Sequence, residues 1–290
     1  MGQKILAVIG GSGLYELPGL TDATSVHAST PFGAPSDDLV RGRLGETTVL
    51  FLPRHGRGHR ILPTELNFRA NVFALKQLGA EWLVSVGAVG SLREHIAPGH
   101  VVVPDQFIDR TVARASTFFG RGIVAHVSLA DPVCPVLSGL VETTARGAGG
   151  TVHRGGTYLC MEGPQFSTRA ESHLYRQWGA DVIGMTNWQE AKLAREAEMC
   201  FASLALVTDY DCWRPGADHV VIADVLRILA ANADLARRTV SDVAQCLPTA
   251  RACACAHALE HAIITERSRI PAAVRAELAP LIDKYVGDAT

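Results

Sequence analysis

Two acidic residues one position apart stand directly after an apolar segment. Residues 202–207 read Ala-Ser-Leu-Ala-Leu-Val, and Asp209 and Asp211 follow within the next four positions. The apolar segment is typical of a strand buried on both faces of a sheet, and ligands of open α/β sheets bind beyond the carboxyl ends of strands. Each carboxylate could accept a hydrogen bond from one edge of a heteroaromatic ring. An acidic turn that caps the next helix is the alternative interpretation.

Three segments rich in small residues each follow a predicted strand and could bind an anion. They are Gly10–Gly13, Arg54–Gly56 and Gly87–Ser91. Glycines let backbone N–H groups approach an anion, the Ser12 hydroxyl and the Arg54 guanidinium suit phosphate oxygens, and His55 could donate as well. The spacing matches neither the Walker A motif nor the full dinucleotide fingerprint, so it favours free phosphate over a nucleotide polyphosphate.

The segment 161–169 is predicted to be a loop with an aromatic side chain near its middle. Phe166 could stack on a flat ring, or it could anchor the loop in the core.

A second motif, His257-Ala258-Leu259-Glu260-His261, matches an inverted zinc-protease pattern. Two histidines four residues apart on a helix can bind zinc, with Glu260 activating water. So short a pattern arises readily by chance, and no downstream helix offers an obvious third ligand. We therefore interpret it as a solvated helix face and predict no metal site.

The seven cysteines are scattered, which is not the pattern of a secreted disulfide framework. They are Cys134, Cys160, Cys200, Cys212, Cys246, Cys253 and Cys255. Cys253 and Cys255 could close a small strained disulfide, but reduced thiols in a helix are the preferred interpretation.

These residues need a framework of alternating strands and helices, and the apolar pattern supplies one. The predicted strands are residues 5–10, 48–53, 82–86, 101–104, 181–185 and 202–207, and the predicted helices are residues 64–78, 189–199 and 223–245. We find no repeat, linker or composition break. The sequence predicts one α/β domain over residues 1–250, with residues 251–290 as an Ala-rich helical extension packed on it.

The bulk composition excludes several classes of partner. The chain has 290 residues, 48% of them hydrophobic and 19% charged, with a formal net charge of −2. No cluster of Lys and Arg points to nucleic acid or to an anionic membrane. The first apolar run, Ile5–Gly10, is too short for a signal peptide or a membrane span, so we predict a cytoplasmic protein.

Taken together, the motifs closely resemble 5′-methylthioadenosine phosphorylases, within the trimeric purine nucleoside phosphorylase family. The resemblance rests on Gly10–Leu14, Thr30–Ser36, Arg54–Gly56, Gly90–Arg93, Asp105–Thr111, Glu162–Ser172, Trp178–Ile183 and Thr208–Trp213. These segments run in order over most of residues 5–245, and such a set is very specific. The resemblance implies a central mixed β-sheet surrounded by helices, and a homotrimer.

The resemblance also implies phosphorolysis, in which phosphate attacks C1′ of a nucleoside without a cofactor. It assigns phosphate binding to Ser12, Arg54, His55, Gly87, Ala88 and Thr186, purine binding to Phe166, Ser167, Asp209 and Asp211, and the ribose and 5′ pocket to Met185, Ile222, Val225 and His126. Asp209 would supply a hydrogen bond or proton at purine N7, and Asp211 would accept from the 6-amino group. His126 would reach the 5′ pocket of a neighbouring subunit, or it is an ordinary loop histidine.

Residue types within this resemblance favour 5′-methylthioadenosine as the substrate. Relatives that act on 6-oxopurines carry Asn in place of Asp209 and Glu in place of Ser167. An apolar 5′ lining suits a thioether, although it discriminates against a hydroxyl by only about 10²-fold. Gly87 replaces a phosphate-contacting threonine, and Gly184 replaces an Asn common in adenine-selective relatives.

Three other functions remain open at this point. An adenosine or 6-oxopurine nucleoside phosphorylase stays within the same class of enzyme. A zinc hydrolase would use His257, Glu260 and His261, and a catalytically silent purine-binding protein is suggested by the loss of a hydroxyl at Gly87.

Overall fold

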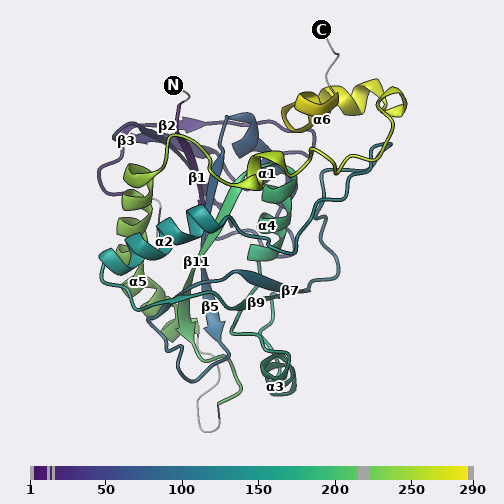
Figure 1. Cartoon of the computed structure of the whole chain (residues 1–290). Helices are drawn as coiled ribbons and strands as arrows, with labels where there is room; N and C mark the ends of the chain where they lie inside the picture. The colour runs from purple at the N-terminus through teal and green to yellow at the C-terminus, as the bar shows by residue number, and fades with distance from the viewer. Residues whose placement is uncertain (1–2, 12–13, 15–16, 215–221, 287–290) are drawn as a thin grey trace.

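The central feature of the fold is one mixed sheet, seen in a computed structural model that describes residues 3–11, 14, 17–214 and 222–286 (Figure 1). Within these residues the sheet has eleven strands. They are β1 (Ile5–Gly10), β2 (Thr21–Val26), β3 (Leu39–Leu44), β4 (Thr47–Pro53), β5 (Trp82–Ser91), β6 (Val101–Val103), β7 (Gln106–Arg110), β8 (Val152–Arg154), β9 (Thr157–Met161), β10 (Val182–Gly184) and β11 (Cys200–Asp209).

Strand β5 is the branch point of the sheet. Its first half pairs in parallel with β1, its whole length pairs in parallel with β11, and its last two residues pair antiparallel with β10. β1 also pairs in parallel with β4. The carboxyl ends of β1, β4, β5 and β11 therefore meet at one edge, where ligands of such sheets bind.

Helices cover both faces of the central strands. α1 (Phe68–Gln77) and α4 (Asn187–Glu196) pack on one face, and α2 (Pro135–Gly147) and α5 (Ile222–Cys246) pack on the other (Figure 1). Because the strands are buried on both sides, they carry nearly continuous apolar sequences rather than alternating ones. α3 (Arg169–Gln177) lies near the carboxyl ends of β5 and β11. This arrangement confirms the predicted α/β class with a mixed sheet. No described helix combines the length and apolarity that crossing a bilayer requires.

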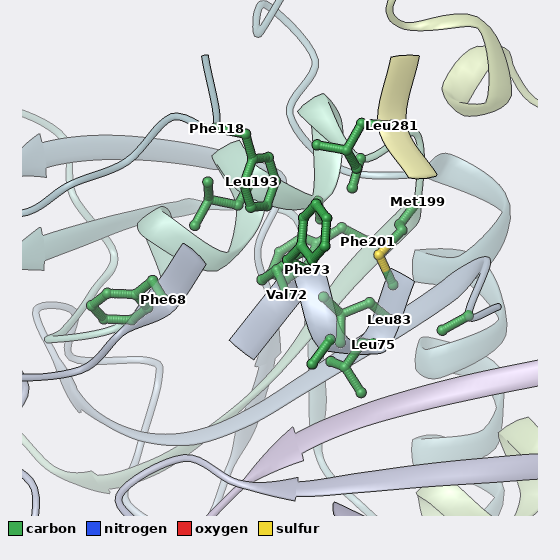
Figure 2. Close-up of a cluster of buried hydrophobic side chains, with 14 of the residues drawn as sticks. Phe68, Val72, Phe73, Leu75, Leu83, Phe118, Leu193, Met199, Phe201 and Leu281 are labelled. Atoms are coloured by element: carbon green, nitrogen blue, oxygen red, sulfur yellow. The ribbon is translucent and has the colours of Figure 1, made fainter. Parts of the chain in front are cut away.

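The larger hydrophobic core joins the C-terminal segment to the body of the protein. Side chains from α1, α4, β11 and α6 (Ala272–Val286) pack together, among them Phe73, Leu193, Phe201 and Leu281 (Figure 2). All four are nearly inaccessible to solvent. Residues up to Val286 therefore pack on the same body as the sheet.

The C-terminal extension is less helical than its composition predicted. α6 is an α-helix, but Ala254–His257 and Arg267–Arg269 form short 3-10 helices and the residues between them form turns and irregular backbone. Propensity is a weak constraint where tertiary contacts fix the chain, and Pro271 before α6 disfavours a continuous helix.

Two further predictions about elements were wrong. The strand predicted at residues 82–86 does not end there: residues 87–91 form the second half of β5, because β11 and β10 provide backbone partners along that segment. The first helix begins at Phe68 rather than at residue 64, because the Asn67 side chain accepts from the backbone N–H of Ala70 and caps the helix there.

Candidate active site

A cavity of about 300 Å³ lies at the carboxyl ends of β1, β4, β5 and β11. The sequence-predicted site residues that line it are Arg54, His55, Gly87, Ala88, Phe166, Met185, Thr186, Asp209, Asp211 and Val225. Residues from positions 54 to 225 thus meet in one place, although they come from six separate segments. The lining includes acidic, basic and apolar residues.

Asp209 and Asp211 form the acidic end of the cavity. Asp209 accepts hydrogen bonds from the Thr208 hydroxyl (2.8 Å) and from the backbone N–H of Asp211 (2.7 Å). Burial raises the pKa of Asp209 above its ordinary value, with both hydrogen bonds acting in the opposite direction. Burial likewise raises the pKa of Asp211, whose Oδ2 has no hydrogen-bond partner. A buried oxygen without a partner is costly, so this atom is suited to accept from a ligand.

The loop that carries the two aspartates is fixed by its aromatic residues. The Trp213 indole donates to the Ser91 carbonyl (2.8 Å), and the Tyr210 hydroxyl donates to the Glu94 carbonyl (3.3 Å). Asp211 adopts a left-handed backbone conformation (φ 52°). A Cβ at Gly90 would come within 2.9 Å of Asp209 Oδ1, so glycine is needed where β5 passes the carboxylate.

Arg54 lies at the other end of the cavity, and most of its donors are already used. Nε bonds to Glu190 at 2.6 Å, Nη2 bonds to Ser85 at 2.8 Å, and Nη1 bonds to the Val86 carbonyl at 3.0 Å. Glu190 neutralises the buried guanidinium, which is 3% exposed. One of the two Nη1 protons remains available to a ligand. The Nη1 nitrogen is 3.6 Å from the place where a Cβ on Gly87 would be.

His55 is neutral at physiological pH. Burial lowers its pKa to about 4, and the charge of Arg54 acts in the same direction. Its Nδ1 lies 2.8 Å from the Ile61 carbonyl, which can only accept, so the proton of the neutral ring is on Nδ1. Nε2 is then an acceptor, which corrects the prediction of a donor. It can accept the P–OH hydrogen of a phosphate that carries a proton. The His59 ring stacks on the His55 ring, with 4.3 Å between the ring centroids.

The amino end of α4 supplies an anion-binding element beside Arg54. Thr186 is the N-cap residue of this ten-residue helix and lines the cavity, yet its side chain makes no capping hydrogen bond. The first peptide N–H groups of a helix lack intrahelical partners and carry the positive end of its dipole. The Thr186 hydroxyl and these N–H groups can therefore both bind phosphate oxygens.

Residues of α5 as far as Ala236 form one wall of the cavity. Val225, Leu226, Leu229, Ala233 and Ala236 line it. Their spacing of three and four residues places them on one face of the helix, a stripe that the sequence already contained. Ile222, predicted to lie in the same pocket, is 55% exposed and does not line the cavity of the single chain.

The other predicted residues occupy varied positions. Phe166 is 45% exposed at the cavity, as a stacking residue would be, and not an anchor in the core. Ser167 does not line the cavity, and its hydroxyl lies 3.7 Å from the Met161 sulfur. His126 is exposed and also does not line it. Ser12 lies outside the described residues.

Arg114 is a positioning residue that the sequence interpretation missed. Its buried guanidinium pairs with Glu162 (3.2 Å), donates to Gln189 of α4 (3.0 Å) and bonds to the backbone carbonyls of Glu162 and Met185. It therefore ties the loop that carries Phe166 to the end of β10 and to α4. Glu190 and Ser85 were also missed, because a buried partner for Arg54 has no signature in sequence.

Tyr158 explains why residue 184 is glycine. A Cβ on Gly184 would lie 1.9 Å from the Tyr158 hydroxyl, so any other residue would displace this buried ring. An Asn at position 184 would therefore not fit unless the Tyr158 phenol moved.

The zinc-protease motif does not form the geometry that it would need. His257 ends a 3-10 helix and Glu260 and His261 follow in turns, so the pattern is not displayed on an α-helix. The side chains of His257 and Glu260 are exposed, and His257 Nδ1 lies 3.6 Å from Glu260 Oε2. Among the described residues, the group of ligand atoms that converges is a different one, Cys134, Cys200, Cys253 and Cys255.

Comparisons with known proteins agree with the geometry of the cavity. A profile of the Phosphorylase superfamily matches residues 5–245. The S-methyl-5′-thioadenosine phosphorylases of Geobacter sulfurreducens and Cereibacter sphaeroides are 55% and 54% identical to this chain, each covering 98% of it, with 100% and 98% of their own lengths matched.

Solved structures show the same relationship. A methylthioadenosine phosphorylase from an Antarctic soil metagenomic library superposes with a TM-score of 0.90 at 48% identity, over 97% of this chain and 100% of that one. The methylthioadenosine phosphorylase of Schistosoma mansoni in complex with adenine gives a TM-score of 0.79 at 32% identity, over 97% and 98% of the two chains. This chain therefore belongs to the Phosphorylase superfamily and, within it, to the S-methyl-5′-thioadenosine phosphorylase family.

Proposed function

We propose that this protein catalyses the phosphorolysis of 5′-methylthioadenosine to adenine and 5-methylthioribose 1-phosphate. A phosphate oxygen forms a bond to C1′ as the bond from C1′ to purine N9 breaks. The electron pair of the broken bond leaves with the purine, and a proton added at N7 makes adenine neutral. This chemistry requires charge stabilisation on the leaving base, a phosphate held beneath C1′ and exclusion of water.

The observation that carries the proposal is that one cavity combines an acidic end with an anion-binding end. Gly90 lies against Asp209, Gly87 lies against Arg54, and the two glycines are three residues apart on β5. Three strand steps span about 10 Å, a separation that a purine joined to a pentose can bridge. A nucleoside and a phosphate therefore fit together in the cavity.

In this arrangement Asp209 is the general acid. A carboxyl group whose pKa is raised by burial retains its proton more readily, so it can donate to N7 when negative charge develops on the purine. The unpartnered Oδ2 of Asp211 accepts from the 6-amino group. Phe166 stacks on the base, and Ser167 contributes through the position of this loop.

The phosphate is held by side chains and by backbone groups. Thr186 and the amino end of α4 donate hydrogen bonds to it, and the remaining Arg54 proton provides a charged donor. Neutral His55 accepts a hydrogen bond from a phosphate hydroxyl through Nε2. Gly87 and Ala88 bring the backbone of β5 close to it, and Ser12, which lies outside the described residues, is assigned to the phosphate by the resemblance alone. The phosphate is a co-substrate, and no cofactor takes part.

The apolar face of α5 selects the thioether. Val225 with Leu229 and its neighbours offers no hydrogen bond to a 5′-hydroxyl, whereas a methylthio group gains by burial there. Met185 lies against the ribose. Because the 5′ pocket favours the thioether, adenosine is a slower substrate. Ile222 affects the 5′ pocket only if a neighbouring subunit covers this residue.

The test is a phosphate-dependent assay of three nucleosides: 5′-methylthioadenosine, adenosine and inosine. The expected order of kcat/KM is methylthioadenosine first, adenosine second and inosine far behind. A clear preference for inosine would overturn the assignment of the acidic end. Purine binding without release of any base would indicate a silent binding protein instead.

We also infer a homotrimer that works in the cytoplasm. His126 is exposed, lies outside its own chain's cavity and has its backbone N–H bonded to Ala262, so it is available to a neighbouring subunit. No disulfide joins any of the described cysteines, which suits a reducing compartment. Light scattering should give three times the chain mass, and His126→Ala should raise KM for methylthioadenosine without changing that mass.

A further inference from the structure

Four cysteine side chains from distant parts of the chain converge on one point. Cys134 is the N-cap of α2, Cys200 begins β11, and Cys253 and Cys255 belong to the segment after α5. All four sulfur atoms lie within 4.8 Å of one another. None of the four cysteines lines the cavity in which the phosphorolysis proposed above takes place, so the cluster has no role in that chemistry.

The sulfur separations fit a shared centre. Cys253 Sγ lies 3.3 Å from Cys200 Sγ and 3.6 Å from Cys134 Sγ. In a tetrahedral Zn–S₄ site with Zn–S bonds of about 2.3 Å, the sulfurs are about 3.8 Å apart. A disulfide requires a separation of about 2.05 Å between two chosen partners. Cys253 instead approaches two different sulfurs almost equally.

The surroundings of the cluster also suit thiolate ligands. Cys134, Cys200 and Cys255 are buried, while Cys253 is partly exposed and leaves a path from solvent. The backbone N–H of Leu137 points at Cys134 Sγ from 3.5 Å, in the first turn of the thirteen-residue helix α2. A helix amino end stabilises a thiolate, and a hydrogen bond to a ligating sulfur orients it.

We propose that Cys134, Cys200, Cys253 and Cys255 form a tetrathiolate site for one zinc ion. Binding replaces four S–H bonds by four Zn–S bonds and releases four protons to solvent, with no change of oxidation state. All four positions are filled by protein, which is the arrangement of a structural site rather than of a catalytic one with an open position.

The site cross-links three segments at a distance from the cavity. It joins α2, the amino end of β11 and the C-terminal segment, whereas Asp209 lies at the carboxyl end of the same strand. Nine strand steps separate Cys200 from Asp209, about 30 Å. The ion therefore stabilises the fold and leaves the turnover of nucleoside unchanged.

The experiment measures metal directly on the full-length protein. The protein is purified in the presence of a non-chelating reductant, and its zinc is quantified by mass spectrometry. We expect one zinc per chain in the wild type. Protein produced in cobalt-supplemented medium should show the thiolate-to-cobalt charge-transfer absorption of a four-sulfur site, a readout that needs no variant.

Two variants localise the ion. Cys253→Ser changes the partly exposed ligand, and we expect at least a tenfold loss of bound zinc, a lower thermal midpoint and an unchanged kcat. Cys246→Ser is the matched control, because Cys246 is exposed and outside the cluster. It should retain the metal and the thermal midpoint of the wild type.

Three results would overturn the proposal. One is a metal-free wild type in which all four thiols react with an alkylating reagent after unfolding without reduction. Another is a mass deficit of about 2 Da for each pair of cysteines, which would show that they are disulfides. The third is zinc that survives in Cys253→Ser at the wild-type amount, which would place the ion elsewhere.

Discussion

The two ends of β11 differ in how their side chains are satisfied by their surroundings. At the carboxyl end, Asp209 and Asp211 are buried beside a cavity, one carboxylate oxygen has no partner, and Asp211 has a left-handed backbone. At the amino end, Cys200 is fully buried and its thiol contacts other thiols. Unsatisfied polar groups and an unusual backbone are destabilising and are retained where a ligand compensates. The comparison therefore separates the end of the strand that acts on substrate from the end that holds the fold.

The most damaging change at the carboxyl end should be Asp209→Asn. An amide cannot deliver a proton to N7, so we expect kcat on methylthioadenosine to fall by about 10²–10⁴. KM for phosphate should change little, because Arg54 and Thr186 lie at the other end of the cavity. Steady-state kinetics with each substrate varied in turn would check this.

Asp211→Asn is the matching control for Asp209→Asn, because it makes the same change two residues away. Asp211→Asn keeps the general acid but changes the partner of the 6-amino group, so its main effect should be on kcat/KM for the nucleoside. An unchanged kcat in Asp209→Asn would remove the leaving-group role from this residue.

The next effect concerns the 5′ pocket. Val225→Thr is nearly isosteric and places a hydroxyl on the α5 wall, so the preference for methylthioadenosine over adenosine should fall by roughly tenfold. Ile222→Thr is one turn earlier on α5 but outside the cavity, and it should leave the ratio of the two kcat/KM values unchanged. Equal effects of the two substitutions would mean that the pocket extends to Ile222 in the assembled enzyme.

A smaller effect is expected at Gly87, which has no side chain to offer a hydroxyl to the phosphate. A Cβ at Gly87 would make only an ordinary contact with Arg54 Nη1 (3.6 Å), so Gly87→Thr fits in β5. The added hydroxyl beside Arg54 should lower KM for phosphate about fivefold, since one hydrogen bond contributes about 1 kcal/mol. Gly87→Val adds the same bulk without the hydroxyl. If valine lowers this KM equally, hydrogen bonding is not the cause.

The carboxyl end was far easier to predict from sequence than the amino end. Asp209 and Asp211 follow an apolar strand directly, and their separation by one residue is visible in the chain. Thr186 follows β10, which pairs antiparallel with β5, but Arg54 and Gly87 come directly after segments that the sequence predicts to be strands. Parallel strands bring such segments to one edge, so local patterns are enough to predict that they meet.

The rest of the site depended on contacts without a local pattern. Glu190 and Arg114 neutralise or orient other residues across 136 and 48 positions of sequence, respectively. The thiol cluster joins cysteines 119 and 53 positions apart, which is why the sequence interpretation considered only Cys253 and Cys255. His55 was predicted as a donor because only the structure shows the carbonyl that fixes its proton on Nδ1.

The smallest effect on catalysis should come from a change at Glu196. This residue is the last of α4, four positions before β11 begins. Its carboxylate is 6% exposed and accepts from the Thr117 hydroxyl (2.7 Å) and the Phe118 backbone N–H (2.8 Å). Burial raises its pKa to about 7, against the effect of both hydrogen bonds. Because the folded pKa is above the unfolded one, this group's contribution to stability is present at low pH and is lost as pH rises through about 7.

Glu196→Gln should therefore flatten the pH dependence of stability without altering catalysis. At pH 8 the variant should be more stable by on the order of 2 kcal/mol, a rise of roughly 5 °C in Tm, whereas at pH 5 the two proteins should melt alike. Glu46→Gln, at an exposed position, is the control and should melt as the wild type does at both pH values. A change in kcat without a change in Tm would contradict the division of β11 into a catalytic end and a structural end, because Glu196 lies close to the amino end of β11, which we expect to be structural.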